Sequence, residues 1–341
     1  MDRRKFLAGT AGLTAGLTAT TMMPRLSLAA DTTALTAQFG WIANVEYGDH
    51  FIALENGFFA EDDLEVEISA GGPNAPNPLT MVSAGTAQIG YASWLPFLDA
   101  VSQGNDFVLI AARFQQSPLG IISMAKKPIL TAEDIVGSRI LLQGASEETA
   151  IQATLGLNGI SGEFTAVPAG FSPEPLLAGD GDGYTAFATN QVITMETMGL
   201  ERDKDFFFKT FDELGFPGYA GIAFVERKFL EANRDALVAY TAGLMKAWKV
   251  SYDDPAYAAR LAVETYGRDY GLDLDQQTRQ NTAQIDFVFP GMDADYPLFT
   301  LDKAKMSGIM YDAARATGRT DLPDIDSIVD TSIVEDARKM L

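Results

Sequence analysis

The chain has 341 residues, 47% of them hydrophobic, and its 46 acidic and 25 basic side chains give a net charge of -21. This charge would repel the phosphates of nucleic acids and anionic membranes, so we expect neither as a partner. The chain has no cysteine and a single histidine, His50. These counts exclude disulfides and thiolate metal sites and disfavour histidine-based catalysis, so we expect no metal, no other cofactor and no catalytic residue.

The first thirty residues have the layout of a bacterial export signal. Arg3 and Arg4 stand in a charged segment, an uncharged stretch follows over residues 8–23, and residues 27–30 offer a small-residue cleavage site. The paired arginines before Phe-Leu resemble the twin-arginine type. The apolar part is short and interrupted by glycines, so an uncleaved anchor is the less favoured alternative. We expect cleavage after residue 30, and a mature periplasmic protein that does not insert into the membrane.

From residue 35, short apolar runs alternate with helix-like stretches, a pattern typical of parallel α/β structure. In the first series, we expect strands at 35–39, 64–68, 87–91 and 107–112 and helices at 47–56, 77–84 and 95–103. Gly57 and Gly85 follow the first two helices, where a left-handed cap favours glycine. In the second series, we expect strands at 120–124, 139–143, 163–167 and 184–188 and helices at 131–135, 146–157 and 190–198.

Long amphipathic helices are expected beyond residue 224, at 227–233, 235–252, 255–266, 274–285 and 300–316. Two α/β series, joined near 117–118 and again near 219–224, predict two lobes with two crossings between them. Lobe 1 would comprise residues 31–116 and 225–341, and lobe 2 residues 117–224. Ligands of such folds bind at the carboxyl ends of strands, so we expect a cleft between the lobes.

The segments that follow the expected strands are rich in aromatic and amide side chains. The candidate ligand contacts are Trp41, Asn44, Glu46, Tyr47, Asn74, Ser93 and Trp94 in lobe 1 and Phe171, Tyr184, Phe187 and Asn190 in lobe 2. Aromatic rings with amides and a carboxylate suit a flat solute with a polar edge. The alternatives are loop packing for the tryptophans and solvent exposure for Glu46 and for acidic pairs such as Glu147-Glu148.

Several short motifs follow one another in a definite order between residues 35 and 267. They are Trp41-x-x-Asn44, Gly57-Phe58-Phe59 before the acidic strand 64–68, the segments 82–90 and 183–191, and Ala247-Trp248 before Asp254-Pro255. This order resembles the periplasmic solute-binding proteins related to thiamine-pyrimidine synthase. The resemblance implies a type II periplasmic-binding fold that closes on a small solute and delivers it to an ABC permease. Members of the family bind thiamine-precursor pyrimidines, riboflavin or, more distantly, alkylsulfonates and taurine.

The resemblance also implies roles for single residues. In pyrimidine binders of this kind, aromatic side chains sandwich the ring and a carboxylate contacts its amino groups, and Trp41, Tyr47 and Glu46 occupy the matching loop. Eukaryotic pyrimidine synthases of the family carry a histidine where this chain has Tyr47, and they need a cysteine-rich motif that this chain lacks. Alkylsulfonate binding would favour a basic pocket, for which Arg113 is the candidate in lobe 1.

The sequence therefore predicts a monomeric, non-enzymatic binding protein for a small N-heteroaromatic solute. Three alternatives remain open. One is an alkylsulfonate or taurine binder of the same fold, and another is a secreted enzyme with Glu46 or Asp49 as general base. The third is a sensor domain that reports ligand occupancy to a membrane receptor.

Overall fold

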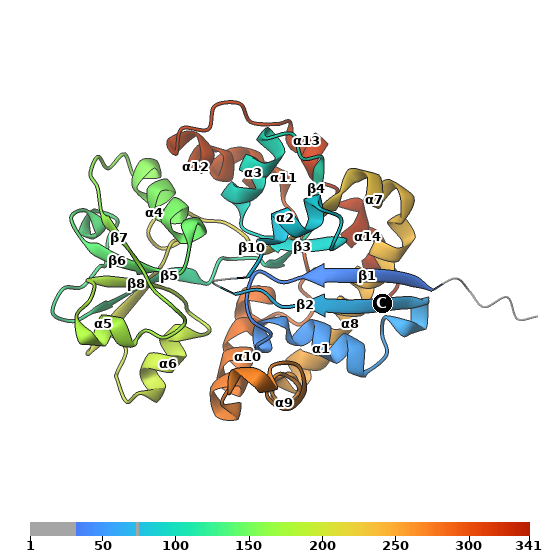
Figure 1. Ribbon diagram of the computed structural model, residues 1–341, viewed down its shortest axis with the longest axis horizontal. Helices are drawn as coiled ribbons and strands as arrows, with labels where there is room; N and C mark the ends of the chain where they lie inside the picture. The colour runs from blue at the N-terminus through green and yellow to red at the C-terminus, as the bar shows by residue number, and fades with distance from the viewer. Residues whose placement is uncertain (1–31, 73–74) are drawn as a thin grey trace, which may run out of the picture. The chain divides into compact units, whose positions relative to one another are not determined.

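Two five-stranded sheets organise residues 32–72 and 75–341, the part of the chain that the computed structural model describes (Figure 1). The expected export signal and Asn74 lie outside these residues. Sheet A has the strand order β2-β1-β3-β10-β4 and sheet B the order β7-β6-β8-β5-β9.

Sheet A contains the first four strands and one late strand. Its members are β1 (Thr33–Gln38), β2 (Leu64–Ser69), β3 (Ile89–Ala92), β4 (Phe107–Phe114) and β10 (Ala220–Glu226). β1 runs parallel to β2 and β3, whereas β10 is antiparallel to both β3 and β4. The expected limit of lobe 2 at residue 224 falls inside β10, whose register assigns residues 220–224 to sheet A.

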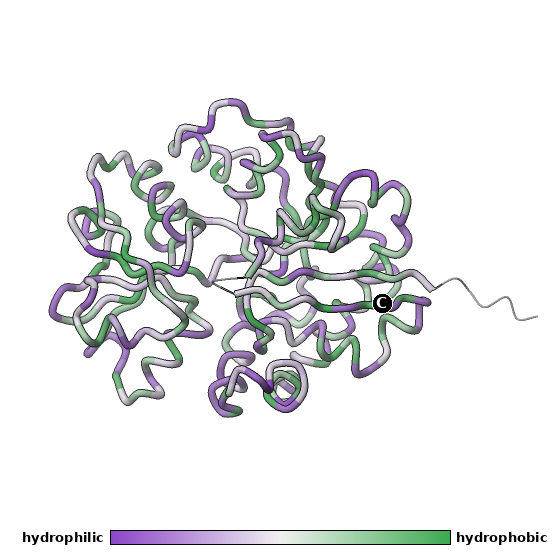
Figure 2. The backbone as a smooth tube through the Cα atoms, in the orientation of Figure 1, coloured by the Kyte–Doolittle hydropathy of each residue, from purple (hydrophilic) through white to green (hydrophobic). Residues whose placement is uncertain are grey.

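Sheet B contains β5 (Leu119–Met124), β6 (Arg139–Leu142), β7 (Thr165–Pro168), β8 (Gly183–Phe187) and β9 (Phe206–Thr210). β6 is parallel to β7 and β8, but β5 is antiparallel to β8 and β9. The expected parallel arrangement therefore fails at β5 and β10, which run antiparallel to both of their neighbours. The chain enters sheet B directly from β4, through residues 115–118, and it returns to sheet A through residues 211–219. Figure 2 shows apolar residues concentrated in the central strands of sheet B.

Helices cover both sheets. Those before residue 200 are α1 (Gly48–Glu55), α2 (Pro78–Ser83), α3 (Trp94–Ser102), α4 (Ala145–Leu157), α5 (Glu174–Ala178) and α6 (Gln191–Thr197). The later ones are α7 (Arg227–Ala232), α8 (Arg234–Asp253), α9 (Pro255–Leu261), α10 (Leu274–Val288), α11 (Lys303–Lys305), α12 (Tyr311–Ala316), α13 (Ile325–Ile328) and α14 (Ser332–Arg338). α8 packs between α1 and α14, and α14 also contacts β4.

Several local predictions are confirmed and others need correction. Gly57 and Gly85 have φ angles of 72° and 70° after α1 and α2, the left-handed caps that the sequence predicts. The expected helix at 131–135 is only a 3-10 turn, Glu133–Ile135. The expected helix over 300–316 is interrupted between α11 and α12, where Gly308 leaves helical geometry with φ -87° and ψ -112°.

Candidate functional site

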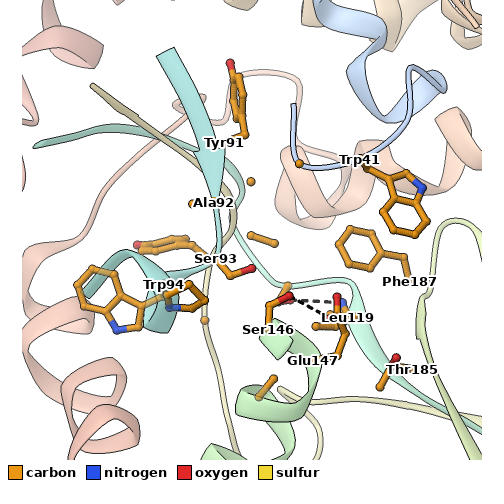
Figure 3. A pocket seen from close by; sticks show the side chains of 18 of the residues that line it. Trp41, Tyr91, Ala92, Ser93, Trp94, Leu119, Ser146, Glu147, Thr185 and Phe187 are labelled. Carbon is orange, nitrogen blue, oxygen red and sulfur yellow. Dashed lines mark hydrogen bonds between the residues drawn. The ribbon is translucent and has the colours of Figure 1, made fainter. Parts of the chain in front are cut away.

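A cavity of about 250 Å³ lies where the ends of the two sheets meet, and it is the candidate site (Figure 3). The segments after β1, β3, β6 and β8 line it, together with residues that precede β5 and β10. The carboxyl ends of parallel strands meet at such an edge, which is where α/β proteins place ligands. A wider groove along α2 and the start of α4 continues from the cavity and shares Trp41, Asn77 and Glu147 with it.

The structure brings together seven of the predicted contact residues. Those that line the cavity are Trp41, Glu46, Tyr47, Ser93, Trp94, Phe187 and Asn190. Asn44, Phe171 and Tyr184 are not part of the lining. The Asn44 side chain accepts a hydrogen bond from the Glu46 N–H at 3.0 Å. Tyr184 is buried within sheet B and donates its hydroxyl hydrogen bond to the Gly170 carbonyl.

The loop after β1 is fixed by local backbone contacts. Asn44 caps the 3-10 turn η1 (Val45–Tyr47), and this turn places Glu46 and Tyr47 at the cavity. Gly71 donates a backbone hydrogen bond to the Trp41 carbonyl at 2.7 Å. A Cβ atom on Gly71 would lie 2.4 Å from the Phe39 carbonyl oxygen, so only glycine permits this close approach.

Trp41 and Trp94 differ in how much of the ring is accessible. Trp41 is half-buried, and its ring meets the exposed Phe171 ring edge-on, with 5.0 Å between centroids. Trp94 is only 3% exposed, its Nε1 donates to the Met310 carbonyl at 3.1 Å, and it stacks against Tyr311. Trp41 therefore keeps part of its side chain accessible, while Trp94 is held within its own packing.

Glu46 is a buried carboxylate at the cavity wall, with an exposed fraction of 9%. Burial raises its pKa from 4.5 to about 7, although the charge of Arg113 and the Tyr47 hydroxyl oppose this shift. Ion pairs between Glu46 and basic side chains are absent from the described part of the chain. A solute with a hydrogen-bond donor would therefore find an acceptor here that no basic side chain has already neutralised.

Tyr47 and Tyr91 separate the cavity from a buried polar network. The Arg113 guanidinium carbon lies 4.4 Å from the centroid of the Tyr47 ring and 4.6 Å from that of Tyr91. Arg113 Nε is 3.3 Å from an Asp49 oxygen, and Trp248 Nε1 donates to the same carboxylate at 3.0 Å. Burial opposes ionisation of Asp49, but Arg113 and His50 outweigh it and keep the Asp49 pKa below its usual value.

His50 belongs to this network and not to the cavity lining. Its Nδ1 lies 2.8 Å from Asp49 and its Nε2 lies 2.6 Å from the Tyr240 hydroxyl, and the side chain is fully buried. Burial lowers the His50 pKa despite the opposing effect of Asp49. The network thus holds Tyr47 and Tyr91 in place. Asp49, which the enzymatic alternative names as a possible general base, is fully buried and does not line the cavity.

Sheet B contributes a second carboxylate that sequence reasoning placed in solvent. Glu147, in the first turn of α4, lines the cavity beside Ser146, whose hydroxyl donates to it at 3.0 Å (Figure 3). Burial raises the pKa of Glu147. Gln143 and Thr185 line the same wall and are hydrogen-bonded to each other. The signal that could have revealed Glu147 is its position, three residues after Gly144 at the exit of β6.

The lining has a distinct charge character. Over residues 32–72 and 75–341, it contains two glutamates and no lysine, arginine or histidine. A grouping of three or more potential metal ligands is likewise absent from these ranges. None of the helices described is both long and apolar enough to cross a membrane. The charged side chains in the described lining are thus acidic.

The sequence comparisons are consistent with one another. The model of the family described as "NMT1/THI5 like" matches residues 44–258. A segment of 127 residues is 26% identical to the 4-amino-5-hydroxymethyl-2-methylpyrimidine phosphate synthase of Legionella pneumophila and covers 37% of this chain. The match spans only 40% of the length of that relative.

Solved structures establish the fold. The alkanesulfonate-binding protein SsuA from Xanthomonas axonopodis pv. citri, bound to MOPS, is similar with a TM-score of 0.63 and 16% identity over 89% of this chain and all of that one. The periplasmic nitrate-binding protein NrtA from Synechocystis PCC 6803 gives a TM-score of 0.63 at 13% identity over 91% of this chain and 89% of that one. At these identities the likeness shows the fold alone, and it confirms the predicted periplasmic-binding-protein architecture.

Proposed function

Because the chain belongs to the NMT1/THI5-like family, we propose that it is an extracytoplasmic solute-binding protein of an ABC importer. It takes a small N-heteroaromatic solute into the cavity between the sheets and presents it to a membrane permease. Thiamine-precursor pyrimidines and riboflavin-like rings are the solute classes that fit this proposal. The protein binds its solute without converting it.

One observation carries the proposal: the cavity combines accessible aromatic rings with a buried carboxylate. Trp41 and Phe187 are half-buried rings in the lining, and each ring pair contributes about 0.5 to 1.5 kcal/mol beyond area burial. Glu46 accepts hydrogen bonds from ring amino groups. Asn190 offers an amide, and its oxygen already accepts from Gln276 of α10 at 3.1 Å. Together these groups favour a flat solute with donors on its edge.

An alkylsulfonate or taurine binder is the second candidate, and one feature favours it. Ser93 is the N-cap residue of α3, is exposed, and makes no capping hydrogen bond with its side chain within the described chain. The start of a helix attracts negative charge. Against this candidate, Arg113 is 1% exposed, is committed to Asp49, and lies behind Tyr47 and Tyr91.

An enzymatic role has less support. The enzymatic alternative names Glu46 or Asp49 as the general base. Asp49 is buried beside Arg113 and does not line the cavity, whereas Glu46 does. A proton-transfer mechanism needs a second group within reach of the substrate, and in the described lining Glu147 is the other carboxylate that such a mechanism would have to use. Incubation of purified protein with the solutes below, followed by product analysis, separates conversion from binding.

Export is part of the proposal and rests on residues 1–30. Arg3 and Arg4, followed by Phe6 and Leu7, have the twin-arginine pattern. Substitution of both arginines by lysine should leave the protein in the cytoplasm of a host that uses this export route. Export that is unchanged in the double variant would contradict the twin-arginine part of the proposal.

The test of the function is a thermal-shift screen with thiamine pyrimidines, thiamine, riboflavin, other N-heterocycles, taurine, alkylsulfonates and nitrate. A solute that binds only the folded state stabilises it by about 2.7 kcal/mol at roughly a hundredfold excess over Kd. We expect a shift with at least one N-heterocycle. Shifts confined to sulfonates or nitrate would overturn the solute class.

A further inference from the structure

Carboxylates from both sheets face the same cavity. Glu46 follows β1 in sheet A, and Glu147 opens α4 after β6 in sheet B. They are far apart in sequence, yet the fold places both in the lining of one space of about 250 Å³. Glu46 is more than nine-tenths buried, and Glu147 is half-buried. Negative charge on both carboxylates in one cavity is unfavourable unless protons or a positively charged group neutralise it.

The protein does not supply that positive charge from the cavity wall. Lysine, arginine and histidine are all absent from the described lining. Arg113 and Lys305 contact residues of the lining from behind, and both interact with other groups of the protein. Arg113 pairs with Asp49 behind two tyrosine rings, and Lys305 lies 4.2 Å from the centroid of the Tyr219 ring while donating to the Gln115 carbonyl.

The aromatic part of the lining favours the same kind of solute. The electron-rich faces of Trp and Tyr attract cations, most strongly at desolvated sites. Trp41, Tyr47 and Tyr91 all line the cavity. Arg113 already lies against Tyr47 and Tyr91 from within the protein, so the half-buried Trp41 is the one of these three rings that Arg113 does not occupy.

From this geometry we propose that the solute is an organic cation whose positive charge lies between Glu46 and Glu147. This inference rests on the proposed function and narrows it from N-heteroaromatic solutes in general to positively charged ones. The solute would join a carboxylate of sheet A to a carboxylate of sheet B, so its charge would hold the two sides of the cavity together. Neutral rings would bind more weakly and anionic rings would be rejected.

The test compares rings of equal size and different charge by isothermal titration at millimolar concentration. The probes are 1-methylnicotinamide, which is permanently cationic, neutral nicotinamide, and anionic pyridine-3-sulfonate. We expect the cation to bind at least about tenfold more tightly than the neutral ring, since a hydrogen-bonded charge contributes more than a neutral contact. Equal affinity for the neutral ring, or preference for the anion, would overturn the inference.

Two matched variants then test whether the carboxylate of Glu147 contacts the positive charge of the solute. Glu147→Gln should weaken binding of 1-methylnicotinamide about tenfold and leave nicotinamide unchanged. Glu148→Gln changes the net charge equally, but Glu148 lies outside the lining, and it should leave both affinities unaltered. Equal effects of the two variants would show that overall charge, and not the cavity carboxylate, selects the cation. Their melting temperatures confirm that both variants are folded.

The inference and the proposed function can fail separately. Binding of nicotinamide as tightly as 1-methylnicotinamide contradicts the inference and leaves a binding protein for neutral heteroaromatic solutes. Absence of binding for every ring in this set and in the thermal-shift screen contradicts both.

Discussion

The guanidinium carbon of Arg113 lies 4.4 Å from the centroid of the Tyr47 ring, and Tyr47 lines the cavity whereas Arg113 does not. Arg113 therefore acts on the site through its wall. Tyr47 also stacks on Phe39, with 3.7 Å between centroids and an interplanar angle of 5°. The ring is thus held from two sides, by an aromatic neighbour and by a cation.

Removal of Arg113 should destabilise the protein strongly. Arg113→Leu leaves the fully buried Asp49 without its ion-pair partner, and loss of one member of such a pair costs about 3 to 5 kcal/mol. Urea unfolding measures this loss. The double variant Arg113→Leu/Asp49→Asn should recover part of the stability, because the uncompensated charge is gone. An Arg113→Leu variant as stable as wild type would contradict the role of this ion pair in holding the fold.

Ionisation of Glu46 should make the folded protein less stable as the pH rises from 4.5 to about 7. Its folded-state pKa of about 7 lies above its usual 4.5, so the folded state binds more protons than the unfolded state between these values. The contribution of Glu46 is fully present below pH 4.5 and is lost as pH rises to about 7. The loss amounts to about 3 kcal/mol.

The substitution Glu46→Gln tests whether Glu46 lowers the stability of the protein as the pH rises. The variant should be close to wild type in stability at pH 5 and more stable than wild type at pH 8, because it removes a carboxylate that ionises at a buried position. The measurement is the free energy of unfolding of both proteins at the two pH values. A difference between the proteins that does not change with pH would contradict the raised pKa.

Trp41→Ala should reduce solute affinity without unfolding the protein. Trp41 is half-buried and lines the cavity, so truncation removes a stacking surface but little of the core. We expect a loss of about tenfold or more, corresponding to roughly 1.4 kcal/mol. Tyr270→Ala is the control, since Tyr270 is 44% exposed and lies outside the lining. Unchanged affinity in a folded Trp41→Ala protein would remove Trp41 from the site.

Solute binding should make the protein more compact. Two short segments, 115–118 and 211–219, connect sheet A with sheet B, which is the connection that permits hinge closure in proteins of this fold. Small-angle scattering at saturating solute should show a smaller radius of gyration than without solute. An unchanged radius at saturation would speak against closure as part of binding.

Periodicity predicted most of the elements because it reflects burial. The run 107–112 reads as a strand, and every residue of β4 is buried. Apolar periodicity does not predict strand direction, because an apolar run does not indicate which strand it will pair with. β10, for example, inserts antiparallel between β3 and β4. β9 was not predicted, and its sequence, Phe206-Phe207-Phe208-Lys209-Thr210, lacks a clear alternation of apolar and polar residues.

The sequence could indicate residues that line the candidate cavity where these residues lie in the segment after a strand. Trp41 and Glu46 lie in the segment that follows β1, Ser93 comes directly after β3, and all three line the cavity. Tyr184 lies within β8 and points into the core, because alternate residues of a strand face opposite sides. Tyr91 and Glu147 line the same cavity, but the sequence analysis did not predict this. Their position depends on how the two sheets come together, which local sequence does not encode.

The most direct test of the account is a crystal structure of the protein with the tightest-binding solute of the screen. We expect a ring in the cavity against Trp41, with its donors or positive charge within hydrogen-bond distance of Glu46 or Glu147. A solute bound outside this cavity would contradict the account, and so would a negatively charged group held at the start of α3 with neither glutamate in contact.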